Sequence, residues 1–516
     1  MPSAIRDLAR LRAPDGGFYS SAGELFSHAI FGRDSAEIAD HLLGLRPDIA
    51  RTLILALARL QGTEESPAGP HSNEEEPGKI HHQHIRLFVG GQRISAAAEL
   101  ILQELGALWG GHADSLTYYG SVDATPLFVR LVGRYCAGYG PALLDEDITA
   151  KDGRAATVGD KVLAAVDWIG RRIDSSPLGF VEFQRRNPNG ITFQVWKDSG
   201  TSYVHRDGTV ADWDQPIAAV EVQAYAYDAL LAAAELFEVA EPGRAREWRE
   251  RADVLRMAIL KRLWMPREAY FAMAVDRGSD GATRHVASIA SNAALLLDSR
   301  LFDQLAGCDE YVEPLARRIC SPEFVTEAGI RCRSVEEADL VDFQDYHGTW
   351  TVWMKETYDV VKGLHRQGLT GSAVQLGRRL LNAVNVAGAN LEFLYVSPAG
   401  EVMYDHHERD LRGGEVEIAG TNYPELGLGW SVAAALSLKH WFGAGVDLYG
   451  AASGVDSRLP RSNLDLAIRA SMPEISVNRT ASDVAAAYAR RGDFIVNQAI
   501  GLARDQEARA RRRTRP

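Results

Sequence analysis

Four short clusters of the sequence bring aromatic side chains and carboxylates together. In chain order they are IFGRDS from Ile30, YYGSVDATP from Tyr118, GFVEFQRRNPNGITFQVWKDSGTSYVHRDG from Gly179, and Gly413 to Leu436. Aromatic faces stack on pyranose rings, and carboxylates accept hydrogen bonds from sugar hydroxyl groups. The clusters therefore indicate a carbohydrate site assembled from loops that are far apart in the sequence.

The third cluster contains the sharpest candidate for acid catalysis, Asp198 in the run Trp196-Lys197-Asp198-Ser199. An apolar neighbour such as an indole raises the pKa of a carboxyl group, which lets the group hold a proton at neutral pH. On the residues alone, a second interpretation is an exposed aspartate in the turn before Gly200.

Two further aspartates precede predicted helices. Asp34 follows Arg33 in the first cluster, and Asp123 follows Tyr118 and Tyr119 in the second. An aspartate at a helix start caps the free backbone N–H groups, so capping alone explains either residue. Capping does not explain the paired tyrosines, which favour a binding role for the second cluster.

A long polar segment, Gly62 to His84 (GTEESPAGPHSNEEEPGKIHHQH), carries an acidic run and several histidines. A metal site would need histidines and carboxylates at fixed spacing, which HHQH on a loop does not provide. The composition predicts a solvated surface loop. No metal ion or other cofactor is expected in this protein.

Helical periodicity dominates the rest of the sequence, in pairs of segments separated by Gly, Pro or polar breaks. Ser35 to Gly62 reads as two helices that part at Arg46-Pro47. The other helices are expected at residues 94–108 and 124–135, and from near Val158, Pro216, Arg244, Val286, Val312, His347, Gly371 and Trp430. About twelve paired helices with no fixed repeat predict an all-α (α/α)6 barrel. Its active site is expected where loops converge at one end of the inner helices.

Short strand-like pieces interrupt the helical pattern and predict β-hairpin excursions in the active-site loops. They are GFVEF, ITFQVW, AYFAMAV and LEFLYV. The predicted barrel domain spans residues 1–445. Residues 446–516 are expected to form a C-terminal extension, with a helix at 482–503 and a disordered basic tail, ARARRRTRP.

Six motifs occur in a fixed order: IFGRDS, EEEPGKIHHQ, TYYGSVDATPLF, GFVEFQRR followed by VWKDSG, AAVEVQAYAYDAL and YHGTWTVW. Together they resemble the bacterial amylo-α-1,6-glucosidase or glycogen-debranching-like glycoside hydrolases, relatives of the glucoamylase and trehalase type of (α/α)6 barrel. The resemblance runs from about Phe26 to Phe442. It implies an inverting α-glycosidase, and the leading hypothesis is an exo-acting enzyme that releases glucose.

The resemblance also implies roles for individual residues. In that family the aspartate of the WKDS motif is the general acid, which is Asp198 here. The residues that the resemblance assigns to the −1 pocket are Arg33, Asp34, Tyr118, Tyr119, Asp123, Trp196, Lys197, Glu221, His347 and Trp353.

The catalytic base implied by the resemblance is Glu417. The family places a glutamate shortly before a YP pair and then a tryptophan, matched here by Tyr423-Pro424 and Trp430. The stretch between these two matches is shorter than in the family pattern, so other glutamates stay open. These are Glu415, Glu425 and, more weakly, Glu392. Inversion needs the acid and the base ~6.5–9.5 Å apart, to leave room for water.

Composition and charge exclude several classes of function. The 516 residues are 46% hydrophobic and 24% charged, as in ordinary globular proteins. A net charge of −13 repels phosphate backbones, so nucleic acid is not an expected partner. Four scattered cysteines predict neither zinc nor disulfides. With no apolar signal or spanning segment, a cytoplasmic protein without membrane contact is expected. The expected partner is a small soluble carbohydrate, and homo-oligomerisation stays open.

Two other functions fit the same barrel. A sugar epimerase or isomerase would use paired pocket histidines, for which His347 with His406 or His407 could serve. A non-catalytic sugar-binding barrel would keep the aromatic pocket but lack the acid or the base. The ordered carboxylate motifs favour hydrolysis over both. The fold alone sets neither the sugar nor the linkage.

Overall fold

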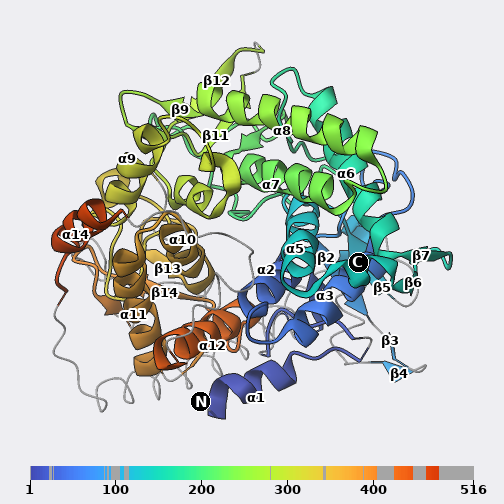
Figure 1. Cartoon of the computed structure of the whole chain (residues 1–516), viewed down its shortest axis with the longest axis horizontal. Coiled ribbons are helices and arrows are strands. Elements are labelled where there is room, and N and C mark those ends of the chain that lie inside the picture. The colour runs from blue at the N-terminus through green and yellow to red at the C-terminus, as the bar shows by residue number, and fades with distance from the viewer. Residues whose placement is uncertain are drawn as a thin grey trace, which may run out of the picture.

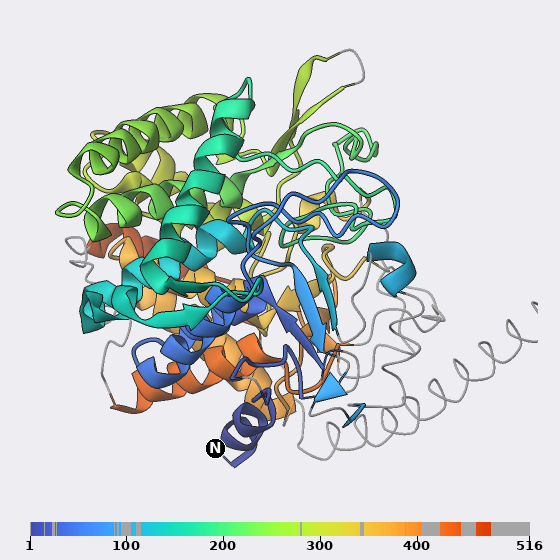
Figure 2. The ribbon, with the colours of Figure 1, turned by 90° about the vertical axis from the view of Figure 1, so that its right-hand side faces the viewer.

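The computed structural model consists of two layers of helices around a common centre, with short strands and long loops at one end (Figures 1 and 2). The described residues are 2–14, 16–22, 26, 28–86, 88–89, 92–93, 105–109, 115–278, 281–340, 345–387, 389–403, 424–444 and 461–475. None of the described helices is both long and apolar enough to cross a membrane.

Six helices of the described chain form a closed inner ring (Figure 1). They are α2 (Gly32–Leu42), α5 (Ala124–Tyr139), α7 (Val220–Leu236), the 3-10 helix η2 (Ser291–Asp298), α10 (Met354–Arg366) and α12 (Gly429–Ala444). Each packs against the next in this order, and α12 packs back against α2. Their residues are buried almost throughout, as expected for helices covered on both faces.

An outer helix packs against each inner one. These are α1 (Pro2–Arg10) on α12, α3 (Pro47–Leu60) on α2, α6 (Val158–Ser175) on α5, α8 (Pro242–Arg262) on α7, α9 (Asp309–Ile319) on η2, and α11 (Thr370–Ala387) on α10. Local signals set their starts: α3 and α8 begin at prolines, and a Thr157–Asp160 capping box opens α6. The predicted (α/α)6 barrel is confirmed.

Smaller elements complete the described chain. The short helices are η1 (Pro141–Asp145), η3 (Arg300–Phe302), η4 (Val335–Glu337) and α14 (Ser462–Ser471), which packs on α11. The strands are β1 (Ala29–Phe31), β2 (Gln83–Arg86), β3 (Phe88–Val89), β4 (Gln92–Arg93), β5 (Ser115–Tyr118), β6 (Asp147–Thr149), β7 (Ala155–Thr157), β8 (Ala218–Ala219), β9 (Trp264–Met265), β10 (Tyr270–Phe271), β11 (Ala274–Arg277), β12 (Thr283–Val286), β13 (Thr351–Trp353), β14 (Phe393–Val396) and β15 (Val402–Met403).

The strands pair into small antiparallel sheets, and each of the three-stranded ones lies at the start of an inner helix. The three-stranded sheets have the orders β1-β2-β5, β12-β11-β8 and β13-β14-β15. Strands β1, β8 and β13 each end one residue before α2, α7 and α10 begin. The register pairs Ile30 with His84 and Val352 with Leu394. The sheets therefore fix the N-terminal ends of inner helices, whose free N–H groups favour negative charge.

Several local predictions are wrong. GFVEF and ITFQVW form turns and isolated bridges rather than strands, and the helix expected from Val286 is the shorter η2. The helix expected from His347 begins only at Met354, because β13 intervenes. Most of the helix expected at 94–108 and all of the one at 482–503 lie outside the described residues.

The acidic segment from Gly62 to His84 is not a solvated loop, because its centre is buried. Glu74, Glu75 and His81 have exposed fractions of 0%, 1% and 0%. Glu74 accepts hydrogen bonds from the Asn187 backbone N–H (3.1 Å) and from the side chains of Gln194 (2.7 Å) and Tyr118 (3.2 Å). These donors satisfy the carboxylate, which explains how an acidic run can lie inside the protein.

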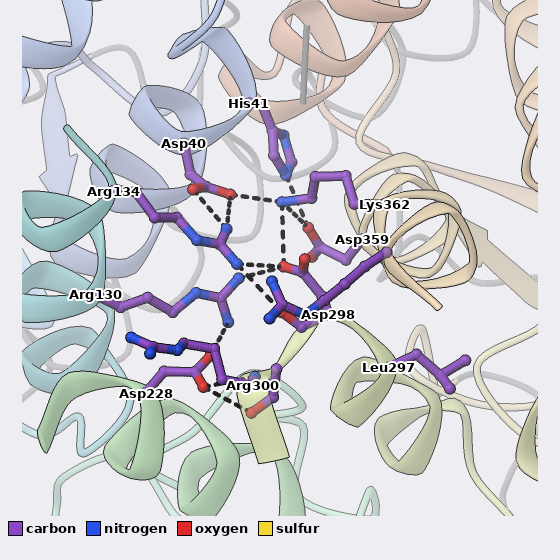
Figure 3. A network of polar contacts seen from close by, with 12 residues as sticks. Asp40, His41, Arg130, Arg134, Asp228, Leu297, Asp298, Arg300, Asp359 and Lys362 are labelled. Atoms are coloured by element: carbon purple, nitrogen blue, oxygen red, sulfur yellow. Dashed lines mark hydrogen bonds and ion pairs between the residues drawn. The ribbon is translucent and has the colours of Figure 1, made fainter. Parts of the chain in front are cut away.

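Charged side chains from the inner helices meet inside the ring (Figure 3). Lys362 of α10 lies 2.6 Å from Asp40 of α2 and 2.9 Å from Asp359. Asp298 of η2 pairs with Arg134 at 3.1 Å and with Arg130, both from α5. The cations lower the pKa of Asp40, Asp298 and Asp359 despite their burial. The helices α2, α5, η2 and α10 thus each supply a charge that a side chain of another of them neutralises.

Replacing Lys362 by Met should destabilise the protein by about 3–5 kcal/mol, because removing one partner leaves buried carboxylates uncompensated. The measurement is the free energy of unfolding from denaturant titration. Arg317→Ala is the matched control, since Arg317 forms an exposed pair with Glu313 and such pairs contribute about 0–1 kcal/mol. Equal losses for the two variants would show that the interior network adds no more stability than a surface pair.

Candidate active site

A pocket opens where the inner helices α2, α10 and α12 begin. Residues from distant segments of the chain meet there, so only the folded barrel creates it. The pocket is lined by Phe26, Phe31, Arg33, Asp34, Trp196, Asp198, Tyr346, His347, Trp353, Glu392, Leu428 and Trp430.

Asp198 lies at the pocket with its side chain 22% exposed. Its carboxylate accepts a hydrogen bond from the Tyr346 hydroxyl at 3.2 Å, and Nη2 of Arg33 lies 3.5 Å from Oδ2. Removal from water raises the pKa of Asp198 to about 6, although Arg33 and the Tyr346 hydrogen bond act in the opposite direction. Asp198 is therefore a carboxyl group that can exchange a proton near neutral pH.

Arg33 is held in place by Asp123, which approaches its guanidinium at 2.9 Å. Neither Asp34 nor Asp123 caps its helix through a side-chain hydrogen bond, so capping does not account for them. Burial raises the pKa of Asp34 to about 6. Gly32 allows the His81 backbone to pack against the start of α2, since a Cβ there would lie 2.0 Å from the His81 carbonyl oxygen. The IFGRDS motif thus supplies one cation and one carboxyl group to the pocket.

Glu392 is a further carboxyl group at this pocket. Its Oε2 accepts the backbone N–H of Glu425 at 3.0 Å, and its own N–H donates to the Glu425 carbonyl at 3.0 Å. Glu425 itself accepts a hydrogen bond from Ser21 at 2.9 Å. Burial, together with the charges of Glu425, Asp34 and Asp198, raises the pKa of Glu392 to about 8. The backbone of Glu425 therefore binds both the main chain and the carboxylate of Glu392, which fixes this residue at the pocket.

Aromatic rings form the wall beside Asp198. The Trp196 ring meets Trp353 at a centroid distance of 4.9 Å and Trp430 at 5.4 Å, both edge to face. His347 stacks on Trp353 at 4.9 Å, and burial lowers its pKa well below the usual value. The wall is thus apolar and rigid, and its histidine is neutral at pH 7.

The remaining residues expected in the pocket are not among those that line it. Tyr118 stacks on Trp109 at 4.6 Å, and the Tyr119 hydroxyl donates to the Leu60 carbonyl. Burial raises the pKa of Glu221 to about 7, and its carboxylate accepts a hydrogen bond from Asn292 at 3.0 Å. The other two residues of this group are Asp123 and Lys197, which are fully buried. Of the expected set, the pocket lining contains Arg33, Asp34, Trp196, Asp198, His347 and Trp353.

The base implied by the resemblance, Glu417, lies outside the described residues, as do Glu415, His406 and His407. Sequence reasoning gave Glu392 little weight and missed Tyr346, which stands directly before His347 in the YHGTW motif. Tyr346 is the first residue of that motif, so its place there could have indicated a role in the pocket. The other lining residues that were not predicted are Phe26, Phe31, Leu428 and Trp430.

One group of potential metal ligands occurs among the described residues, made of Glu37, His41 and Asp359. The ammonium group of Lys355 lies 3.1 Å from Glu37 and 2.9 Å from Asp359, and Lys362 also contacts Asp359 at 2.9 Å. Two lysines thus already provide positive charge to these carboxylates. The group belongs to the interior ion network rather than to a cation site.

Comparison with known proteins gives one domain match and several structural matches. Residues 150–399 match the mannosylglycerate hydrolase MGH1-like glycoside hydrolase domain, and no curated protein sequence matches. A GH63 mannosylglycerate hydrolase from Thermus thermophilus, solved with glucose, shares 15% identity over 84% of this chain and 98% of its own, with a TM-score of 0.53. An uncharacterized conserved protein from the same organism shares 16% identity over 84% and 98%, with a TM-score of 0.51.

At these identities the solved structures support the barrel fold alone. The domain match and the fold together indicate a glycoside hydrolase of the (α/α)6 type. They do not single out an amylo-α-1,6-glucosidase. The matched segment contains both Asp198 and Glu392, whereas Glu417 and Glu425 follow it.

Proposed function

We propose that this protein is an exo-acting, inverting α-glycosidase that hydrolyses a small soluble glycoside, with Asp198 as general acid and Glu392 as general base. The observation that carries the proposal is the presence of both carboxyl groups in one aromatic-walled pocket. Two carboxyl groups are the minimum that inverting hydrolysis requires. The domain match supports the same reaction class.

In the proposed reaction Asp198 donates its proton to the glycosidic oxygen as the bond between that oxygen and C1 breaks. Water attacks C1 from the opposite face, and Glu392 accepts the proton that this water loses. The products are an alcohol and a sugar of inverted anomeric configuration. Arg33 stabilises the Asp198 carboxylate that the reaction leaves behind, since its guanidinium lies 3.5 Å away.

Glu392 replaces Glu417 as our choice of base because of its position. It lines the pocket, and two hydrogen bonds with the Glu425 backbone hold it there, one donated by its own N–H and one accepted by its Oε2. Glu425 does not line the pocket, and its carboxylate is engaged by Ser21. Glu417 stays the competing candidate, and variants of both residues separate the two.

The substrate class follows from the shape of the site and from its relatives. The bulky rings of Trp196, Trp353 and Trp430 favour one terminal sugar over a long polymer chain. The solved relative is named a mannosylglycerate hydrolase, and its structure holds glucose. We therefore propose α-mannosides or α-glucosides of a small hydroxylated aglycone, glycerate included.

The direct test is hydrolysis of a panel of such glycosides, with the first-formed anomer followed by proton NMR. Release of the β-anomer from an α-glycoside is the expected result. Release of the α-anomer would make the enzyme retaining. Absence of hydrolysis across the panel, with sugars still raising the melting temperature, would leave a sugar-binding barrel.

The pH profile of kcat/KM should be a bell with its optimum near pH 7. Activity requires one carboxyl group protonated and the other ionised, and the pKa values of Asp198 and Glu392 are about 6 and about 8. Below pH 6 both groups are protonated, and above pH 8 both are ionised, so activity falls on both sides. A profile measured with one substrate from pH 4 to pH 10, roughly two pH units beyond either value, tests this.

The profile does not assign the two roles. At pH 7 the free enzyme holds its proton on Glu392 more than on Asp198, since Glu392 has the higher pKa. The arrangement with Asp198 protonated and Glu392 ionised is then about a hundredfold less populated than its reverse. Both arrangements give the same bell, so the assignment depends on variants of each residue.

A further inference from the structure

Glu356 lies directly behind the segment that carries Asp198. It occupies the first turn of α10 and is completely buried, with an exposed fraction of 0%. It does not line the pocket. A buried carboxylate is costly unless it is paired and hydrogen bonded, so its partners indicate why it is there.

Both residues that precede Asp198 bind this carboxylate. The indole N–H of Trp196 donates to Oε1 of Glu356 at 3.3 Å, and Nζ of Lys197 lies 3.1 Å from the same oxygen. The Cys332 thiol donates to Oε2 at 3.3 Å. One carboxylate thus holds two consecutive side chains of the WKDS motif.

Lys197 is fixed on its other sides as well. Its ammonium group donates to the Ser291 hydroxyl at 2.7 Å and to the Cys332 carbonyl at 2.8 Å. With Glu356 these contacts use all three donors of the ammonium group. The Lys197 side chain therefore points away from the pocket, while Trp196 and Asp198 on either side of it line the pocket.

We propose that Glu356 is a positioning residue that sets the orientation of Asp198 through Trp196 and Lys197; this inference rests on the proposed function. Consecutive Cα atoms are about 3.8 Å apart, so anchoring both preceding side chains constrains where the Asp198 carboxyl group can lie. A displacement of about 1 Å can cost about a hundredfold in rate. Glu356 thereby affects proton donation without touching substrate.

The test uses Glu356→Gln in the full chain and two kinds of substrate. An α-glycoside with an alcohol leaving group needs a proton from the acid, whereas an α-glycosyl fluoride leaves without one. We expect kcat on the alcohol glycoside to fall about 10–100-fold, with KM within about twofold, if misplacement of the acid is the cause. On the fluoride kcat should fall less than about threefold.

Glu76→Gln is the matched control. Glu76 also binds an indole and an ammonium group, Trp168 at 2.9 Å through Oε2 and Lys79 at 3.2 Å through Oε1, and pairs in addition with Arg172. It does not line the pocket. It should lower the melting temperature and leave the ratio of the two kcat values unchanged. A merely structural Glu356 would behave like Glu76.

A double variant, Lys197→Met with Glu356→Gln, removes both buried charges. It tests the positioning role of Glu356 if the Glu356→Gln variant alone folds poorly. It should show the same selective loss on the alcohol glycoside. Equal losses on both substrates, or a lower melting temperature with unchanged kcat, would overturn the positioning role. Failure of the wild type to hydrolyse either substrate would instead overturn the proposed function, and the positioning role with it.

Discussion

Asp198→Ala should lower kcat on glycosides with alcohol leaving groups by about 10²–10⁴-fold, the usual contribution of a positioned general acid. The same variant should hydrolyse the matching α-glycosyl fluoride within about tenfold of the wild-type rate, since fluoride departs without protonation. The residue lies at the pocket, beside Tyr346 and Arg33. The measurement is kcat on both substrates at pH 7.

Tyr346→Phe provides the control for this experiment. It removes the hydroxyl that donates to Asp198 at 3.2 Å but keeps the ring at the pocket wall. Loss of one hydrogen bond to a charged group costs about 1.5–3 kcal/mol, so the effect should be smaller than that of Asp198→Ala. If Asp198→Ala loses activity on the fluoride as severely as on the alcohol glycoside, Asp198 is not the acid.

The helical layers could be predicted because their signals are local. The break between α2 and α3 stands at Pro47, where the ring of proline fits only the first turn of a helix. The strands could not be placed in the same way. LEFLYV contains β14, while ITFQVW is irregular, because pairing with a distant partner decides strand formation.

The candidate site could be predicted only in part, because a motif does not say which way each side chain points. Trp196 and Asp198 line the pocket, but Lys197 between them faces Glu356. No pattern in the sequence links Lys197 to a glutamate in a helix more than a hundred residues later. The acidic composition around Glu74 predicted a solvated loop, and this prediction is wrong for the same reason. The three groups that donate hydrogen bonds to the buried Glu74 carboxylate come from distant segments of the chain.

Glu392→Ala should lower kcat on both the alcohol glycoside and the fluoride by about 10²–10⁴-fold, since both reactions need an activated water. Removing the side chain also leaves a space beside C1 that a small anion can enter. Added azide should therefore restore the rate on the fluoride without any base. The product should be the β-glycosyl azide, because azide attacks from the face that water uses in an inverting enzyme.

Glu417→Ala and Glu425→Ala distinguish Glu392 from its competitors. Glu425 contacts Glu392 through its backbone N–H at 3.0 Å, a donor that the alanine variant keeps. The fall in kcat for Glu425→Ala should therefore be much smaller than that for Glu392→Ala. Azide rescue confined to Glu417→Ala would place the base at Glu417, as the sequence resemblance first implied. Rescue confined to Glu392→Ala would instead place both catalytic carboxyl groups within residues 150–399, the segment that matches the hydrolase domain.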